Sequence, residues 1–183
     1  MSITYCVYDS LDAIPLDAGR WDEIAAETRV GSIFLQRNWI FSWWRYLAQD
    51  KKLYFVTAIE NSHVCAFAPL MIDKSNTLRF IGDMNADYLG FAVPEGRPEL
   101  INGFFTFLHT NRSDWNVIHL RNIPRDSLLG KQISAASRRS RLHAWRNYSV
   151  PAPYLNLSAN PKMADKIIRK YSLRRAERQL TNQ

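Results

Sequence analysis

The chain has 183 residues and a formal net charge of +7, with 46% hydrophobic and 22% charged residues. This composition excludes a disordered, collagen-like or coiled-coil chain, and the length predicts one α/β domain plus a further partial element. No apolar run reaches the length of a membrane span. Asp9 and Asp12 interrupt any apolar segment near the N-terminus, so we expect no signal peptide and a cytoplasmic location.

The first half of the chain predicts a strand, two helices and then a group of strands. Residues 3–8 alternate and favour a strand. Residues 20–29 and 38–48 carry apolar side chains at the spacing of a helix face, and Asn38 is the expected N-cap of the second helix. Pro69 should mark a bulge, a strand end or an edge, because it cannot donate a ladder hydrogen bond. The later strands are predicted at residues 53–59, 64–72, 78–81 and 88–93.

The second half predicts a further strand and helix pattern. Residues 98–109 place their apolar side chains on one broad helix face. The remaining elements are predicted as a strand at 115–120, a helix from 124 or 125 to about 137, strands at 142–150 and 154–157, and a basic helix from about Pro161. This order predicts an α/β sandwich in which helices pack on a mixed sheet.

The two cysteines and the charges are distributed unevenly. Cys6 and Cys65 lie in apolar, strand-like runs without metal-ligand spacing, so we expect buried free thiols and no metal site. Residues 1–92 carry 8 Lys and Arg against 11 Asp and Glu, and residues 93–183 carry 16 against 6, giving net charges of −3 and +10. The excess of basic residues in the second half can attract a polyanion, or these residues can simply form a solvent-exposed face.

Six short motifs follow one another along the chain. They are Ser32–Gln36 with Trp39 and Trp43–Trp44, then Ala66–Leu70, Arg79–Gly82, Asp87–Gly90, Leu120–Pro124 and Pro153–Leu157. Together they resemble the N-terminal half of the CelD-like acetyltransferases, which belong to the GNAT superfamily and are related to the FemAB peptidyltransferases. The resemblance extends from about Trp21 to the last residue.

The resemblance implies a particular domain organisation. Residues 1–158 would form a GNAT-like domain with a mixed, largely antiparallel sheet flanked by helices. Residues 159–183 would form a basic connecting helix, in which Tyr171–Arg175 is similar to a segment of the family that precedes a second GNAT-like domain. Because the chain ends at Gln183, we expect that second, catalytic domain to be absent and the chain to be truncated.

The acyl-CoA site of this superfamily uses an Arg/Gln-x-x-Gly-x-Gly/Ala loop at a helix N-terminus. None of the seven glycines lies two positions from another. The nearest match, Arg79–Met84, has Asp83 where the phosphate anion would lie and Met84 where a small residue is needed. The family therefore implies acetyl-CoA or another acyl-CoA, but we expect no cofactor site in this chain.

Five residues are candidate substrate-binding groups. Asp87 and Tyr88 end a polar segment and could orient or deprotonate an acceptor, but a structural turn is the favoured interpretation because the reaction partner is absent. Trp44 could bind a sugar ring or pack in the core. Arg174 and Arg175 could bind a polyanion, dock a second domain or face solvent.

These observations leave three functional hypotheses. The first is the N-terminal part of a GNAT-type acyltransferase, which moves an acyl group from CoA to an amine or hydroxyl of a sugar or amino-acid derivative. Whether this chain alone is an enzyme stays open. The second is a nucleic-acid or polyanion-binding module, which the lack of a recognised motif disfavours. The third is an interaction domain that docks a second GNAT-like domain or self-associates.

Overall fold

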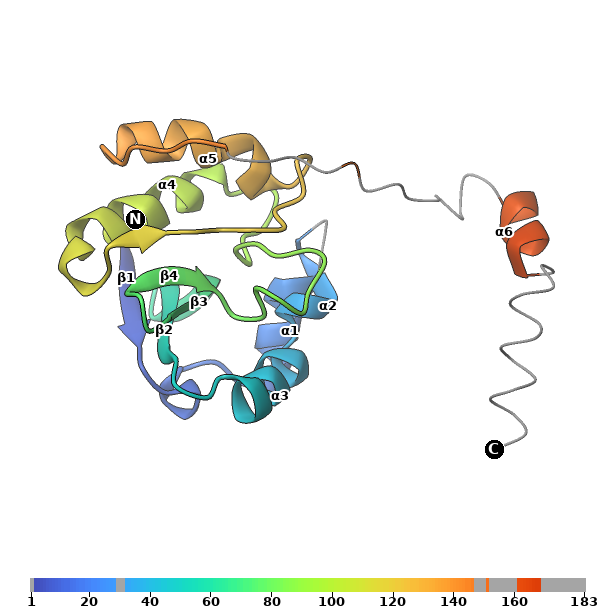
Figure 1. Ribbon diagram of the computed structural model, residues 1–183, viewed down its shortest axis with the longest axis horizontal. Coiled ribbons are helices and arrows are strands. Elements are labelled where there is room, and N and C mark those ends of the chain that lie inside the picture. The colour runs from blue at the N-terminus through green and yellow to red at the C-terminus, as the bar shows by residue number, and fades with distance from the viewer. Residues whose placement is uncertain (1, 29–31, 147–150, 152–160, 169–183) are drawn as a thin grey trace. The chain divides into compact units, whose positions relative to one another are not determined.

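The computed structural model describes residues 2–28, 32–146, 151 and 161–168 (Figure 1). The chain divides into two units, Met1–Ala144 and Trp145–Gln183. In the second unit the described helix is α6 (Pro161–Ile168), which begins where the basic helix was predicted. The predicted strand at 154–157, the predicted junction after residue 158 and the rest of the basic helix lie outside the described residues.

The first unit is built on a five-stranded sheet with the strand order β1-β2-β3-β4-β5. Neighbours from β1 to β4 pair antiparallel, whereas β4 and β5 pair parallel. The strands are β1 (Ile3–Tyr8), β2 (Lys52–Glu60), β3 (His63–Ile72), β4 (Thr77–Phe80) and β5 (Val117–Ile118). The predicted α/β class, with a largely antiparallel sheet flanked by helices, is confirmed.

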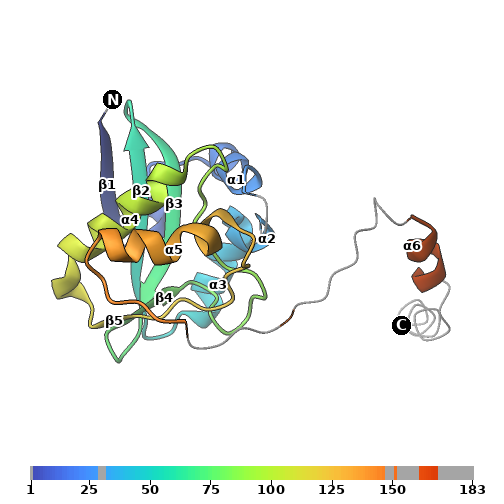
Figure 2. The ribbon, with the colours of Figure 1, turned by 90° about the horizontal axis from the view of Figure 1, so that it is seen from above.

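Helices cover the two faces of this sheet, as Figures 1 and 2 show. On one face lie α1 (Ala18–Ala26), α2 (Ser32–Leu35) and α3 (Arg37–Leu47). On the other lie α4 (Pro98–Thr110) and α5 (Leu128–Arg139). Two short 3₁₀ turns, η1 (Leu11–Ala13) and η2 (Arg112–Asp114), follow β1 and α4. Because α4 connects β4 to β5, the parallel pair has the crossover that such pairs require.

Two hydrophobic cores lie on opposite faces of β2 and β3, which explains why these strands are apolar on both faces over most of their length. In the core under α1 to α3, Trp21 packs its ring 5.0 Å from that of Phe55 and 4.9 Å from that of Phe67. The Trp21 indole also donates a 2.8 Å hydrogen bond to the carbonyl of Leu35. Each buried ring of this size contributes about 2–3 kcal/mol to stability.

Two helix starts differ from prediction. The N-cap of α3 is Gln36 rather than Asn38, and its side chain makes no cap hydrogen bond. Instead Asp22 of α1 accepts a 2.8 Å hydrogen bond from the backbone N–H of Arg37, so a distant carboxylate does the capping. Helix α5 begins three or four residues later than predicted, after Ser127, whose hydroxyl accepts a hydrogen bond from a backbone N–H in the first turn.

Three predicted strands are wrong in whole or in part. Residues 88–93 form no strand and contribute only a bridge between Ala92 and Phe67. Residues 142–146 are not a strand either, and the predicted strand at 115–120 shortens to Val117–Ile118. The apolar side chains of 88–93 are still mostly buried, because an apolar run indicates burial and does not require a pairing partner.

Pro69 lies inside β3, opposite Phe55 of β2. Its carbonyl accepts a 2.9 Å hydrogen bond from Ile81, the residue just after β4. Pro69 is thus inside a central strand and away from the register shift at Ala58 and Ile59, so it marks neither a bulge nor an end or edge of β3. The ladder to β4 ends beside it, at Phe80, which removes the need for its missing N–H there.

Cys6 and Cys65 are free thiols, as predicted, but both are half-buried. Within the described residues, no helix combines the length and apolar character needed to cross a membrane.

Candidate functional site

The carboxyl ends of the parallel strands β4 and β5 carry a turn and a set of charged side chains. After β4, Gly82 adopts a positive φ of 89°, and a Cβ atom there would lie 2.1 Å from the ring of Trp39. Only glycine fits this backbone and this contact. The turn that it permits brings Asp83 back towards Arg79 of β4. In open α/β sheets this end of a parallel pair is a common location for ligand sites.

The charged set, here called the Arg79 cluster, consists of Asp73, Arg79, Asp83, His119 and Arg121. Arg79 Nε lies 2.7 Å from Asp73 Oδ2, and its Nη1 lies 2.9 Å from Asp83 Oδ2. The same Nη1 lies 3.0 Å from Nδ1 of His119, which follows β5. Arg121 Nε lies 3.8 Å from Asp83 Oδ1. One guanidinium therefore joins groups from the β3–β4 turn, the segment after β4 and the segment after β5.

The cluster is held together by burial and charge pairing. Asp83 is only 3% exposed, and its Oδ1 accepts no hydrogen bond. A buried carboxylate needs a cationic partner, which Arg79 supplies. Burial acts to raise the pKa of Asp73, but hydrogen bonds from Arg79 and from two backbone N–H groups outweigh it and lower that pKa. Burial likewise acts to lower the pKa of Arg79, and its two carboxylate partners reverse the direction.

The geometry assigns a tautomer to His119. A guanidinium only donates hydrogen bonds, so Nδ1 of His119 accepts from Arg79 and Nε2 carries the proton. His119 is exposed, and 44% of the Arg121 side chain is accessible. The cluster therefore presents an imidazole N–H and a guanidinium edge, which can donate hydrogen bonds to a carboxylate, carbonyl or phosphate oxygen.

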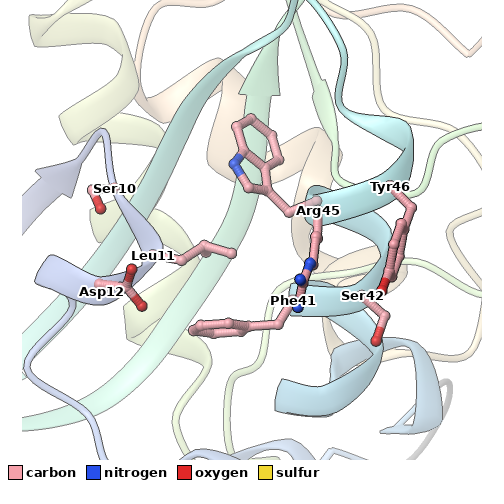
Figure 3. Close-up of a pocket in the computed structure, with 8 residues that line it drawn as sticks. Ser10, Leu11, Asp12, Phe41, Ser42, Arg45 and Tyr46 are labelled. Carbon is pink, nitrogen blue, oxygen red and sulfur yellow. The ribbon is translucent and has the colours of Figure 1, made fainter.

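A second candidate site is a surface pocket of about 390 Å³ between η1 and α3, here called the α3 pocket. Figure 3 shows its two sides, one from the end of β1 and η1 and the other from α3. The lining residues are Ser10, Leu11, Asp12, Phe41, Ser42, Trp44, Arg45 and Tyr46.

The structure separates the predicted site residues. Trp44 is half-buried and lines the α3 pocket. Asp87 is exposed and Tyr88 is half-buried, and neither lines that pocket. Arg174 and Arg175 lie outside the described residues, so their predicted role stays a prediction.

The Arg79 cluster was not predicted from the sequence. Arg79 and Asp83 were considered only as part of a phosphate-binding loop, whereas the structure pairs them with each other. The one available signal was their spacing of four residues at a strand end; His119 and Arg121 gave none. Within the described part of the chain, no three His, Cys, Asp or Glu side chains are grouped to hold a metal ion.

No family model matches the chain, and neither a curated protein nor a solved structure matches it.

Proposed function

We propose that Met1–Ala144 is the acceptor-side domain of a GNAT-type acyltransferase, and that another domain holds the acyl-CoA. The observation that carries this proposal is the parallel pair β4 and β5, joined by α4, with Asp83, His119 and Arg121 of the Arg79 cluster after its carboxyl ends. The mixed, largely antiparallel sheet flanked by helices, which the CelD-like resemblance implies, supports the proposal.

The exposed hydrogen-bond donors of the cluster, on His119 and Arg121, favour an acceptor that carries a carboxylate or phosphate beside its amine or hydroxyl. Asp73 and Asp83 hydrogen-bond to Arg79, whereas Arg121 forms a longer ion pair, 3.8 Å from its Nε to Asp83 Oδ1, and its Nη1 contacts the sulfur of Met84. Arg121 and the Nε2–H of His119 can therefore bind a carboxylate or phosphate oxygen and orient the acceptor. An amino-acid derivative or a sugar phosphate with a free amine has this chemistry.

The same turn is poorly suited to the pyrophosphate of acyl-CoA. A pyrophosphate site needs backbone N–H groups at a helix N-terminus, but residues 81–85 form a turn that no helix follows directly. The carboxylate of Asp83 lies buried within this turn. These features support a donor site in another domain.

Two titrations of the purified chain test the proposal. In calorimetry at moderate salt, acetyl-CoA should bind no better than tripolyphosphate, which controls for charge. In a nuclear magnetic resonance titration, glutamate or glucosamine 6-phosphate should shift the side-chain signals of Arg121 and His119 saturably. Arg121→Met should remove these shifts, and the matched variant Arg138→Met, on the exposed surface of α5, should retain them.

Either of two results would refute the proposal. Saturable acetyl-CoA binding well above the tripolyphosphate control would place a donor site in this chain. Absence of site-specific shifts with both amine probes would remove the acceptor role of the Arg79 cluster.

A further inference from the structure

The α3 pocket combines aromatic and polar side chains because of helical spacing. Phe41, Trp44 and Arg45 follow the i, i+3 and i+4 spacing, so they lie on one face of α3. Ser42 and Tyr46 follow the same spacing on the adjoining face. Figure 3 shows Asp12 and Leu11 of η1 on the opposite side, with Leu11 directed towards α3. The pocket volume of about 390 Å³ is within the range of small-molecule sites.

The polar groups of the pocket have unused hydrogen-bonding capacity. Among the described residues, the side chains of Ser10, Asp12, Ser42 and Arg45 form no hydrogen bond or ion pair with another side chain or the backbone. All four are exposed. Donors and acceptors from η1 and from α3 therefore line one pocket and are available to a ligand.

The aromatic groups of the pocket differ in how they are used. Phe41 already has the Arg37 guanidinium 3.9 Å from its ring centroid and Trp21 against its edge. Trp44 is half-buried, and within the described part of the chain neither an aromatic ring nor a cation stacks on it. Tyr46 is 70% exposed. Trp44 packs partly against the core and exposes the rest of its side chain, and the Arg45 guanidinium lies 5.5 Å from the ring centroid of Tyr46. Part of an indole and a phenol therefore lie beside the polar groups of the pocket.

The charge of the pocket restricts the class of ligand. Asp12 and Arg45 contribute one charge of each sign, so the lining is neutral overall. A phosphate or a polycarboxylate would be repelled by Asp12 and would gain little from a single arginine. An uncharged molecule with an apolar face and many hydroxyl groups matches both the rings and the free donors and acceptors.

We propose that the α3 pocket is a binding site for a neutral saccharide, with the ring of Trp44 against the sugar face and Asp12 and Arg45 on the hydroxyl groups. This inference goes beyond the proposed function, since it concerns residues that the Arg79 cluster does not share. The two can fail separately.

The test uses the wild-type chain and three neutral probes, cellotetraose, maltotetraose and chitotetraose. The chain has six tryptophans, so a ¹⁵N spectrum resolves the indole N–H of Trp44 once Trp44→Phe assigns it. We expect at least one probe to shift that signal saturably. Trp44→Ala should weaken calorimetric binding at least about tenfold, and Asp12→Asn should weaken it to a smaller extent.

Three controls keep the result interpretable. Trp145→Ala removes a 79% exposed indole outside the pocket and should leave binding unchanged. Arg121→Met should also leave it unchanged, which separates this site from the Arg79 cluster. If Trp44→Ala fails to fold, the shift of the Trp44 indole signal in the wild-type chain still shows whether a saccharide binds in the pocket. A Trp44 signal that none of the neutral probes moves, or that moves only with charged oligogalacturonate, would overturn the proposal.

Discussion

Replacing Gly103 of α4 with alanine tests how this helix packs on β1. A Cβ atom at this position would lie 1.8 Å from Oη and 2.2 Å from Cζ of Tyr5. The tyrosine cannot yield freely, because its hydroxyl donates a 3.3 Å hydrogen bond to the carbonyl of Leu100 and its ring packs 5.1 Å from that of Phe104. Burial raises the pKa of Tyr5 to about 12, in agreement with a phenol enclosed by these groups.

Two opposing effects set the change in the free energy of unfolding that Gly103→Ala should cause. Alanine is a better helix former than glycine by about 1 kcal/mol. Overpacking the contact with Tyr5 costs about 1–3 kcal/mol, so Gly103→Ala should lower the free energy of unfolding by about 1 kcal/mol on balance. In a Tyr5→Ala background the clash is absent, and the same substitution should raise the free energy of unfolding by about 1 kcal/mol. The sign of the effect therefore reverses.

Urea unfolding of the four proteins of this cycle, followed by far-ultraviolet circular dichroism, measures the reversal, provided that the m-values agree. Gly96→Ala is the matched control, because a Cβ there meets nothing within 4 Å, and its effect should be the same in both backgrounds. If Gly103→Ala stabilises the protein equally with and without the Tyr5 ring, the packing of α4 on β1 described above is wrong.

Three further predictions concern charge, pH and backbone. Arg79→Met removes the hydrogen-bonded cation of the buried Asp83 and leaves only Arg121 at 3.8 Å, so it should lower the free energy of unfolding by about 2–3 kcal/mol, with partial recovery when Asp83→Asn is added. Urea titrations at neutral pH measure both changes, and an unchanged stability would contradict the pairing. Burial raises the pKa of Tyr5 and Tyr54 above the usual value of 10.0, so two of the eight tyrosines should form phenolate last in an ultraviolet titration. The contribution of these two neutral phenols to folding stability is complete below pH 10.0, the usual tyrosine pKa, and is lost as the pH rises through their raised pKa values. If all tyrosines form phenolate together in the titration, this prediction is wrong. Gly82→Ala forces a side chain onto a positive φ and into an aromatic ring and should lower the unfolding midpoint by several degrees in a thermal melt, whereas an unaltered midpoint would rule out the tight turn.

Hydrophobic spacing predicted most elements of the first unit, because burial is what such spacing records. The same reasoning failed at residues 88–93. Leu89 and Ala92 are buried as a strand pattern indicates, but their backbone N–H groups bond to the carbonyls of Asn122 and Phe67. Periodicity carries no information on which backbone partner a residue will meet.

The Arg79 cluster was beyond the reach of the sequence for a related reason. Arg79 and His119 are 40 positions apart and meet because α4 returns the chain to pair β5 beside β4. The cap on α3 is similar in kind, since Asp22 reaches Arg37 from another helix. Trp44 could be identified as a candidate because its position on a helix face follows from the neighbouring sequence. Its pocket could not be predicted, because the opposite side is formed by η1, which is distant in sequence.

The burial of β2 and β3 on both faces changes what specifies their register. In most hairpins a slip of one residue moves apolar side chains into water, but here it would exchange one core for the other. The face under α4 carries Ala58, Ala66 and Ala68, and the face under α1 carries Phe55 and Phe67. A slip would force phenylalanines into the space of alanines and leave voids on the other side. Side-chain volume therefore sets this register. The three alanines should tolerate enlargement least, even when the larger residue is itself hydrophobic.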